Sequence, residues 1–428
     1  MLGQDENQIR KSVGGGKSIF ILTSHYPYPE GEQFLETEIP VWRQHFDGRI
    51  VLMPASADGK PRCLPEGVDL CHALSDSYQS VIVRARAIVL SFFFLMFWKE
   101  IGFLRQKGKL SARTAFHALK AVTHVLVAKT ALRWAIRNYG HPDIVYTYWF
   151  SYHAFAAGML SSKTVVVTRA HGGDLYEDRS PDLHMYLKRQ FLHRIDRIYV
   201  ISQDGIRYMR DFFRVEKNVE LSRLGVEIPS YMSNSSAHRC ISILSISFCV
   251  SIKNIDRIMD AVCIAAAKMN DVKISWRHIG DGPLRSVLEA RAENLFAGTP
   301  IDWRFLGQME NSAVLHYLET HPVDFILNAS SSEGIPVSIM EAMARGVPAI
   351  APNVGGISEL VCDDNGVLLA ADVSGEEIAT AIIDGIDRLK SLIVRRNAAE
   401  TIKNNFDRDT NYRLFIQNIV ELSDSRCR

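Results

Sequence analysis

Short runs of apolar, β-branched residues alternate with longer amphipathic stretches along most of the chain. In the first half these runs predict strands at Ser18–Thr23, Arg49–Met53, Asp143–Tyr148, Thr164–Thr168 and Arg197–Ile201. Such alternation is typical of βαβ units, which build a parallel sheet with helices on both faces. Residues 1–228 are therefore predicted to form a doubly wound, Rossmann-like α/β domain.

A polar stretch at residues 229–239 (PSYMSNSSAHR) interrupts the alternation and predicts a linker. The strands predicted after it are Ile241–Ser247, Val272–Ile279, Ile301–Leu306, Asp324–Asn328, Ala349–Ala351 and Gly366–Leu369. The helices predicted between and beside them are Asp256–Met269, Pro283–Asn294, Ser312–Thr320 and Val337–Ala344. We expect a second Rossmann-like domain at residues 229–405, followed by a C-terminal helix at 406–428 that packs back on the first domain. Two such domains would bind ligand in a central cleft, where the carboxyl ends of both sets of strands meet.

Charge and cysteine content narrow the possible partners. Lys and Arg number 49 against 48 Asp and Glu, so no net basic field is available to hold nucleic acid. The seven cysteines are scattered and never spaced as C-x-x-C, which favours a reducing compartment over a disulfide framework. The polar first residues lack the flanks of a secretory leader, and we expect a cytoplasmic protein.

One apolar run is long enough to require an interpretation of its own. Residues 87–98 (AIVLSFFFLMFW) span 12 positions, too few for a membrane-spanning helix. Cations surround the run and Glu100 is the only local acid; the cations are Arg84, Arg86, Lys99, Arg105, Lys107, Lys109 and Arg113. Residues 84–113 therefore predict either a monotopic contact with anionic lipid at the inner face of a membrane or a buried helix with solvated charged flanks.

The predicted strand Asp324–Asn328 leads through a polar turn into a helix. Residues 330–348 read SSSEGIPVSIMEAMARGVP, and a first helical proline and a terminal Gly346 predict a helix over about Pro336–Arg345. A helix N-terminus offers unpaired N–H groups and partial positive charge. This turn therefore suits a diphosphate.

Two glutamates in this segment could bind the remainder of a nucleotide sugar. Glu333 lies at the mouth of the predicted helix, where its carboxylate would accept hydrogen bonds from sugar hydroxyls. Glu341, farther into the helix, could accept hydrogen bonds from vicinal hydroxyls such as those of ribose. The alternative for either glutamate alone is a surface acid that only complements the helix dipole.

The spacing of Glu333 and Glu341, with seven residues between them, resembles the E-x7-E region of retaining family 4 glycosyltransferases, which have the GT-B fold. The likeness extends to IGDGPL at residues 279–284, FLG at 305–307 and GGISEL at 355–360, and covers most of residues 240–370. The resemblance implies two Rossmann-like domains facing a central cleft and a metal-independent enzyme that uses a nucleotide-sugar donor.

The same resemblance implies roles for particular residues. Glu333 would contact the transferring sugar and Glu341 the ribose of the donor. The backbone that holds sugar hydroxyls and phosphate would be that of Gly334, Ile335, Pro336, Val337 and Ser338. Gly282 and Met309 lie in loops that resemble those lining the nucleotide pocket, although both loops are also ordinary connections between strand and helix.

The family usually has an arginine and a lysine, five residues apart, after the first strand of the second domain. Here Lys253 keeps the lysine position, but Phe248 stands where the arginine is expected. Lys253 would bind the diphosphate alone, as a point charge without the bidentate geometry of arginine. Either another cation substitutes or donor affinity is reduced.

Two segments of the first domain resemble family elements at the ends of predicted strands. His171 begins HGGD at residues 171–174, similar to the family's His-Gly-x-Asp segment, which implies a catalytic position beside the donor sugar; a structural histidine is the alternative. The loop after the first strand contains Gly31, Glu32 and Gln33 as candidate acceptor contacts, without the family's usual paired glycines.

The sequence thus predicts a retaining glycosyltransferase with His171 and Glu333 as its catalytic residues. The acceptor would be a saccharide or a lipid-linked saccharide in envelope polysaccharide or glycan biosynthesis. Retention without an apparent covalent nucleophile implies displacement on one face of the sugar, so that stabilisation of the leaving diphosphate is the main contribution of the protein. A nucleotide-sugar epimerase and a degenerate GT-B binding or scaffold protein are the alternatives.

Overall fold

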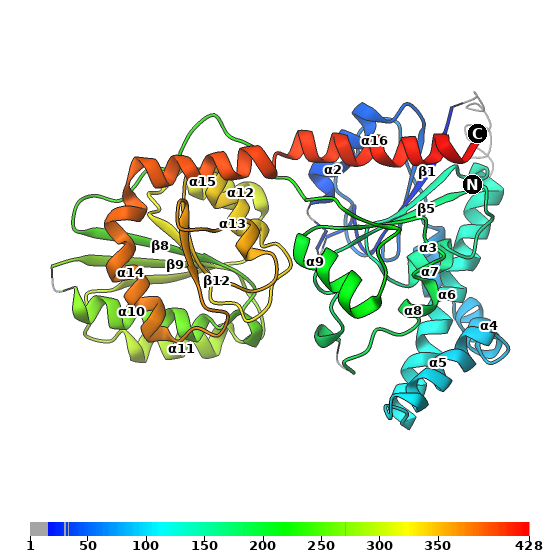
Figure 1. Ribbon diagram of the computed structural model, residues 1–428, viewed down its shortest axis with the longest axis horizontal. Coiled ribbons are helices and arrows are strands. Elements are labelled where there is room, and N and C mark those ends of the chain that lie inside the picture. Colours follow the sequence, from blue (N-terminus) through cyan, green and yellow to red (C-terminus); the bar gives the residue numbers. More distant parts are fainter. Residues whose placement is uncertain (1–15, 30, 33, 181, 270, 428) are drawn as a thin grey trace. The chain divides into compact units, whose positions relative to one another are not determined.

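The computed structural model describes residues 16–29, 31–32, 34–180, 182–269 and 271–427. The chain divides into two compact units. Unit 1 comprises the described residues of Met1–Ile201, Gly205–Ser222 and Tyr412–Arg428, and unit 2 comprises Ser202–Asp204 and the described residues of Arg223–Asn411. Each unit is built on one parallel sheet flanked by helices, which confirms the predicted fold class (Figure 1).

The sheet of unit 1 has seven strands in the order β3-β2-β1-β4-β5-β6-β7, all paired in parallel. The strands are β1 (Ser18–Thr23), β2 (Arg49–Pro54), β3 (Val68–Leu70), β4 (Ile144–Thr147), β5 (Val165–Ala170), β6 (Arg197–Val200) and β7 (Val219–Leu221). The central strands β4 and β5 are buried along their whole length, as expected for a sheet covered on both faces. The edge strands β3 and β7 were not predicted from the sequence.

Helices cover both faces of this sheet and account for most of the remaining chain. They are α2 (Leu35–His45), α3 (Ala73–Gln79), α4 (Val81–Ser91), α5 (Leu95–Gln106), α6 (Ala112–Tyr139), α7 (Tyr152–Ala157), α8 (Lys188–Phe191), α9 (Gln203–Tyr208) and α16 (Arg408–Cys427). Helix α6 begins with a capping box between Ser111 and Thr114, which satisfies two otherwise unpaired N–H groups of its first turn.

The apolar run at residues 87–98 is divided between two helices. Helices α4 and α5 meet at a bend of 60°, so the run does not form one continuous helix as a single apolar segment suggested. Among the described residues no single helix is long and apolar enough to cross a membrane, whereas this bent pair meets the length and composition criteria together.

The last helix completes the core of unit 1. From Tyr412 onward α16 belongs to this unit, and its Phe415 ring packs against those of Trp42, Tyr146 and Tyr199 with centroids 6.0, 5.2 and 4.9 Å apart. Beneath these rings Arg169 of β5 forms an ion pair with Glu38 of α2, with both side chains fully buried.

The sheet of unit 2 has six parallel strands in the order β10-β9-β8-β11-β12-β13. They are β8 (Cys240–Ile246), β9 (Lys273–Ile279), β10 (Asp302–Gly307), β11 (Phe325–Leu327), β12 (Ala349–Pro352) and β13 (Gly366–Leu369). The helices are α10 (Ile255–Lys268), α11 (Arg285–Leu295), α12 (Asn311–Thr320), α13 (Val337–Ala344), α14 (Gly375–Lys390) and α15 (Leu392–Asn405). Figure 1 shows α10 and α11 on one side of this sheet and α12, α13 and α15 on the other.

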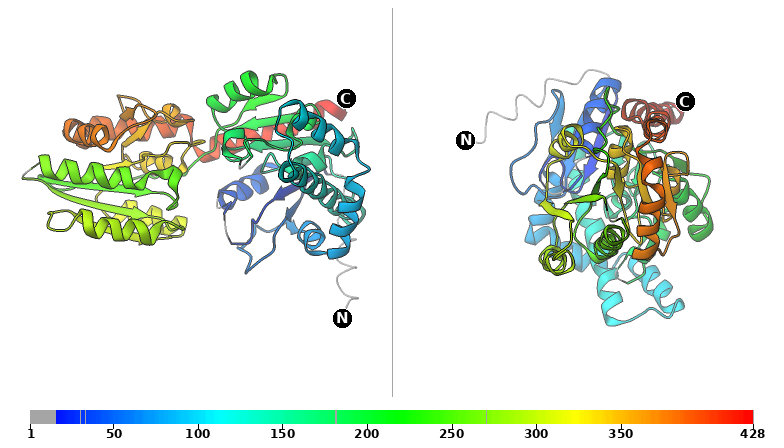
Figure 2. Two further views of the ribbon diagram at one scale, coloured as in Figure 1. Left: turned by 90° about the horizontal axis from the view of Figure 1, so that it is seen from below. Right: turned by 90° about the vertical axis from the view of Figure 1, so that its left-hand side faces the viewer.

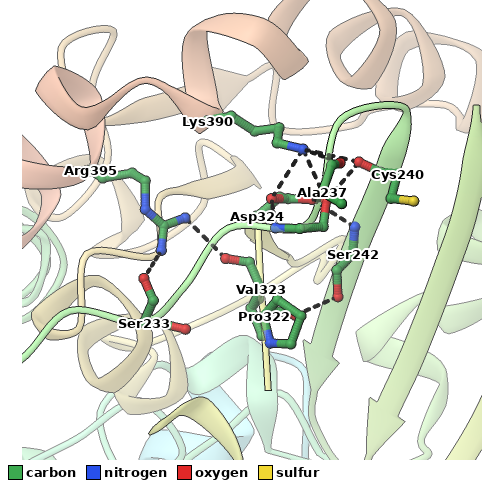
Figure 3. Close-up of polar contacts among 10 residues, drawn as sticks. Ser233, Ala237, Cys240, Ser242, Pro322, Val323, Asp324, Lys390 and Arg395 are labelled. Carbon is green, nitrogen blue, oxygen red and sulfur yellow. Dashed lines mark hydrogen bonds and ion pairs between the residues drawn. The ribbon is translucent and has the colours of Figure 1, made fainter. Parts of the chain in front are cut away.

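The predicted linker is held to unit 2 by a buried carboxylate (Figure 3). Asp324, just before β11, accepts hydrogen bonds from the N–H and hydroxyl of Ser236 at 2.9 and 2.5 Å and from the N–H of Ser242 at 2.7 Å. The Lys390 ammonium lies 3.7 Å from the same carboxylate. Asp324 therefore joins the linker, β8 and the end of α14 at the amino ends of the strands.

The strand order places a topological switch point in each sheet. In unit 1 it lies between β1 and β4, and in unit 2 between β8 and β11. Doubly wound sheets bind ligands at the carboxyl ends of the strands beside such a point. The loops that follow β1 and β4, and those that follow β8 and β11, are therefore the places to look for function.

Candidate functional site

The loops after β8 and β11 are joined to each other in unit 2. The Asn254 side-chain amide donates to the Ala329 carbonyl at 2.9 Å, and the Ser331 N–H donates to the Ile252 carbonyl at 2.9 Å. These bonds hold both loops in one arrangement at the switch point.

Lys253 and Glu333 form an ion pair between these two loops. The Lys253 ammonium lies 2.7 Å from Oε1 of Glu333, and the Asn328 amide donates to the same oxygen at 3.2 Å. Glu333 is buried and Lys253 is partly buried, so the interaction is only weakly screened by water. The predicted sugar-binding acid and the predicted diphosphate-binding cation thus occupy one place in unit 2.

Helix α13 begins beside this ion pair. Its N-cap is Pro336, and none of the described side chains caps its first turn. Gly355 and Gly356 pack directly on the preceding turn, where an added Cβ on Gly355 would lie 1.9 Å from the Glu333 carbonyl oxygen and one on Gly356 would lie 2.6 Å from the Gly334 oxygen. The paired glycines therefore allow the close approach that shapes the Glu333–Ser338 segment.

Glu341 lies farther along α13 and faces Asn311, the first residue of α12. The Asn311 amide donates to Glu341 Oε1 at 2.6 Å. Burial raises the pKa of the Glu341 carboxyl from its ordinary 4.5 to about 7, and the Asn311 hydrogen bond opposes the shift only in part. Burial has removed the water that would otherwise stabilise the ionised carboxyl. Ligand hydroxyls that donate hydrogen bonds to Glu341 would replace that water and favour its ionised form.

We expect Glu341→Gln to stabilise the protein above pH 7. Between pH 4.5 and 7 the native state binds more protons at Glu341 than the unfolded state does, so its stability falls as the pH rises through this window. The variant should gain about 1–3 kcal/mol of unfolding free energy at pH 8 and almost none at pH 4.5. Urea denaturation at both pH values measures this, with the exposed Glu319→Gln as control; an equal gain at both values would contradict the assignment.

Gly282 and Met309 lie in the loops after β9 and β10. Gly282 has φ +152°, and an added Cβ would lie 2.8 Å from the Cys249 carbonyl oxygen, which explains why the turn is glycine. The Gly280 N–H donates to the Gly307 carbonyl at 2.9 Å, so the two loops support each other. Met309 is partly buried beside α12. Gly282 thus shapes the loop that carries Lys253.

Phe248 stands on the loop after β8 with 63% of its surface exposed. Its backbone lies within the turn formed by Ser247 and Cys249, which is fixed by hydrogen bonds to Ile279 and Asp281. The side chain is thus held out from a rigid loop. Arginine at this position would have supplied a second cation near Lys253.

In unit 1 the loop after β1 is organised around Glu32. Its carboxylate accepts the N–H groups of Ser24, His25 and Tyr26 at 2.8, 2.6 and 2.7 Å and the Trp149 indole N–H at 2.5 Å. With four donors on one buried carboxylate, Glu32 orders the loop and joins it to the loop after β4. Gly31 is exposed with φ +85°, and Gln33 lies outside the described residues.

His171 follows β5 and is buried between two aromatic rings. The centroids of Tyr148 and Trp149 lie 4.7 and 4.6 Å from that of His171. Neither ring nitrogen has a hydrogen bond to any of the described residues, and Nδ1 lies 3.8 Å from the Asp174 carboxylate. The backbone N–H of His171 donates to Asp174 at 2.6 Å. A buried imidazole whose nitrogens have no hydrogen bond to the described residues can form one with a ligand.

Three supporting residues were missed from the sequence. Asn328 and Asn311 orient Glu333 and Glu341, and the only available signal was an amide at a strand end or helix start. Lys188 is buried in α8, donates to the Asp174 carbonyl and lies 4.2 Å from the Phe150 ring centroid. Burial lowers the pKa of Lys188 to about 8. It holds the HGGD turn, and nothing in its sequence context indicated this.

Within the part of the chain that the structure describes, no three His, Cys, Asp or Glu side chains come together as a group that could hold a metal ion. The charged side chains at the switch point of unit 2 are Lys253 and Glu333, with Glu341 farther along α13. This set suits a ligand that combines a diphosphate with several hydroxyl groups.

Two family models match the chain. Residues 241–388 match the model described as glycosyl transferases group 1, and residues 100–228 match the model described as glycosyltransferase family 4. The first match contains Lys253, Glu333 and Glu341, and the second contains His171.

Curated relatives share part of the sequence. N-acetyl-alpha-D-glucosaminyl L-malate synthase of Bacillus anthracis is 25% identical over 234 residues, 51% of this chain and 58% of the relative. Alpha-monoglucosyldiacylglycerol synthase of Streptococcus pneumoniae is 24% identical over 221 residues, 48% of each chain. The chain thus spans about half the length of the curated relatives it matches.

Solved structures share the fold over nearly the whole chain. The apo form of the lipopolysaccharide outer core galactosyltransferase WaaB covers 95% of this chain and 99% of its own, with TM-score 0.65 and 15% identity. Anabaena HepE, in complex with UDP and glucose, covers 95% and 100%, with TM-score 0.61 and 15% identity. With glycosyltransferase models on both halves and these fold neighbours, the chain belongs to the family 4 glycosyltransferases and has the GT-B fold.

Proposed function

We propose that the protein is a retaining glycosyltransferase, of the hexosyltransferase type, that moves a sugar from a nucleotide-sugar donor to a saccharide or lipid-linked saccharide. Envelope polysaccharide or glycan biosynthesis is the process that fits such a product. The observation that carries the proposal is the Lys253–Glu333 ion pair at the switch point of unit 2, beside the uncapped start of α13.

Each polar group of this site has a role in donor binding. The diphosphate binds the Lys253 ammonium and the N–H groups at the start of α13. Because Lys253 then pairs with the diphosphate, Glu333 can accept hydrogen bonds from the sugar hydroxyls. Glu341 accepts from the ribose hydroxyls. Fixed positive groups aimed at the leaving diphosphate stabilise the charge that develops there. We propose His171 as a contact of the sugar, and the loop that contains Gly31 and Glu32 as a contact of the acceptor.

Retention follows from displacement on one face of the sugar. The bond from the anomeric carbon to the diphosphate oxygen breaks, the acceptor hydroxyl oxygen bonds to the same face, and its proton passes to the departing diphosphate. No protein nucleophile is needed, which fits a site whose buried acid is already hydrogen-bonded to Asn328.

The names of related proteins support this class of substrate. One relative is named N-acetyl-alpha-D-glucosaminyl L-malate synthase, another alpha-monoglucosyldiacylglycerol synthase, and the HepE structure contains UDP and glucose. For this chain they favour UDP-sugars as the first donors to test. A binding or scaffold protein is the second candidate, because the exposed Phe248 occupies the expected arginine position.

A membrane partner is also part of the proposal. Residues 84–113 contain the exposed cations and the apolar run of α4 and α5, which suits peripheral contact with a membrane that supplies a lipid-linked acceptor. In this proposal the lipid-linked acceptor comes from the membrane, whereas the nucleotide-sugar donor binds in unit 2.

Turnover of a panel of nucleotide sugars tests the proposed activity. We expect one donor to be hydrolysed slowly without an acceptor. Glu333→Gln should lower this rate at least 100-fold, because a neutral amide accepts hydrogen bonds from the sugar hydroxyls less strongly than the carboxylate does in the transition state. Exposed Glu319→Gln is the matched control. An epimerised nucleotide sugar as sole product would favour an epimerase, and no turnover of any donor would favour the scaffold.

A further inference from the structure

We propose that α4 and α5 lie flat in the headgroup region of an anionic bilayer, with the outer face of the bent pair inserted among the lipids. This inference deepens the membrane contact proposed above, and names its surface, its depth and its lipid. It does not depend on donor chemistry, which is carried by unit 2.

The outer face of the bent pair is apolar and exposed. Ile82, Phe93 and Leu95 leave 81, 79 and 65% of their surface exposed. The complete set of large exposed apolar residues on the pair and its bend is Val81, Ile82, Ile88, Val89, Leu90, Phe92, Phe93, Leu95 and Trp98. Seven of the nine lie on α4 and the bend, and Leu95 and Trp98 lie near the start of α5. Exposed apolar surface of this extent marks a contact surface.

The helical periodicity of α4 gives this surface its orientation. At about 100° per residue, Val81, Ala85, Ile88, Val89 and Phe92 share one face. Ala87 and Ser91, which are buried, fall on the opposite side.

Arg84 and Arg86 fall at the two edges of the apolar face and are both exposed. A helix with an apolar outer face bordered by arginines is suited to lie in the plane of a membrane interface, because the long side chains reach up to the phosphates.

The charge around the pair favours anionic lipid over a protein partner. Seven cations lie between residues 81 and 113, all exposed, and they are Arg84, Arg86, Lys99, Arg105, Lys107, Lys109 and Arg113. The only acid in this range, Glu100, is buried. Arg113 forms an ion pair with Asp182 outside this range, and Lys109 donates to the Leu183 carbonyl. Seven cations against one buried acid still leave a basic rim around the apolar face, which is complementary to a surface of phosphate groups.

The inner side of the α4–α5 pair packs against the rest of unit 1. Glu100 accepts from His184 at 2.6 Å and from the Gln190 amide at 2.8 Å, and the Ser91 hydroxyl lies 3.2 Å from that of Thr123 in α6. With these contacts on one side, only the other side is available to lipid. The pair therefore lies on the bilayer surface and does not cross it (Figure 2 shows it at the periphery of unit 1).

Vesicle flotation tests the proposal. We expect the native chain to float with vesicles of phosphatidylglycerol and phosphatidylcholine at low salt, and to float much less with phosphatidylcholine alone. The variant Ile82→Gln/Phe93→Gln should partition at least 10-fold less, since it removes two of the most exposed apolar side chains without touching the core.

Unit 2 offers a matched control. Val287 and Ile393 are also exposed, at 66 and 73%, and Val287→Gln/Ile393→Gln should float as the native chain does. Arg84→Gln/Arg86→Gln should weaken binding to anionic vesicles and reduce its dependence on salt. Donor hydrolysis in the absence of vesicles should be unchanged in all three variants, which separates failure of this proposal from failure of the proposed activity.

Other outcomes would overturn the inference. Equal flotation with neutral vesicles, or equal flotation of native chain and Ile82→Gln/Phe93→Gln, would show that the named surface does not bind anionic lipid. No flotation, together with a dimer in light scattering that Ile82→Gln/Phe93→Gln dissociates, would assign the surface to a second copy of the chain.

Discussion

Replacement of Lys253 by alanine is expected to lower sugar transfer by about 100- to 1,000-fold. Lys253 is the cation that meets Glu333 at the switch point, and with Phe248 in place of the expected arginine it is the only side-chain charge that we assign to the diphosphate. Removing one preorganised group that stabilises a developing charge costs about 3–4 kcal/mol of transition-state stabilisation. The rate with the best donor, measured at saturating acceptor, gives the effect directly.

Lys268→Ala is the matched control for this variant. Lys268 is an exposed lysine at the last turn of α10, the helix that begins two residues after Lys253. It should leave the rate unchanged. If Lys253→Ala retained more than a tenth of the native rate, the diphosphate would be stabilised elsewhere and the proposed mechanism would be wrong.

Arg169→Met is expected to destabilise unit 1 by about 3–5 kcal/mol. Arg169 and Glu38 are fully buried and form an ion pair, and the guanidinium lies 3.9 Å from the Phe415 ring centroid. Removal of one partner leaves the other charge buried and uncompensated, which is the origin of the large cost. Urea denaturation monitored by tryptophan fluorescence measures it, because Trp42 donates to Glu38.

The double variant Glu38→Met/Arg169→Met separates charge burial from packing. Without either charge, an apolar replacement should recover most of the lost stability. The more exposed pair Arg291 and Asp260 provides the comparison, and Arg291→Met should cost less than about 1 kcal/mol. A double variant no more stable than Arg169→Met would show that packing around Phe415 determines the loss.

Much of the fold follows from the sequence because parallel strands buried on both faces are continuous apolar runs. Ser18–Thr23, Gly366–Leu369 and Val337–Ala344 have the bounds expected of them. The strands Val68–Leu70 and Val219–Leu221 were missed because three half-buried residues give no periodic signal.

Tertiary burial explains other differences between the sequence analysis and the structure. The strand predicted at Thr164–Thr168 continues through Arg169 to Ala170. A charged residue at this point of the sequence indicates the end of a buried strand, but the buried Glu38 carboxylate of α2 compensates the charge of Arg169. The apolar run at residues 87–98 bends at its aromatic centre, which composition alone does not reveal.

The site was predictable where topology determines it. Lys253 and Glu333 follow neighbouring strands, so the strand order brings them together even though 79 residues separate them in the sequence. The role of Glu32 was not predictable, because its four donors come from backbone and indole groups that meet only in the folded loop. Nor could the spacing of Glu341 reveal that burial raises its pKa.

Calorimetric titration of the 428-residue chain with nucleoside diphosphates tests whether unit 2 holds a donor site at its switch point. We expect one nucleoside diphosphate to bind with a Kd of roughly 1 μM to 1 mM. Lys253→Ala should weaken this binding at least 10-fold, whereas Lys268→Ala should not change it. Absence of binding by every nucleoside diphosphate, or equal affinity in the native chain and Lys253→Ala, would contradict a donor site at the switch point of unit 2.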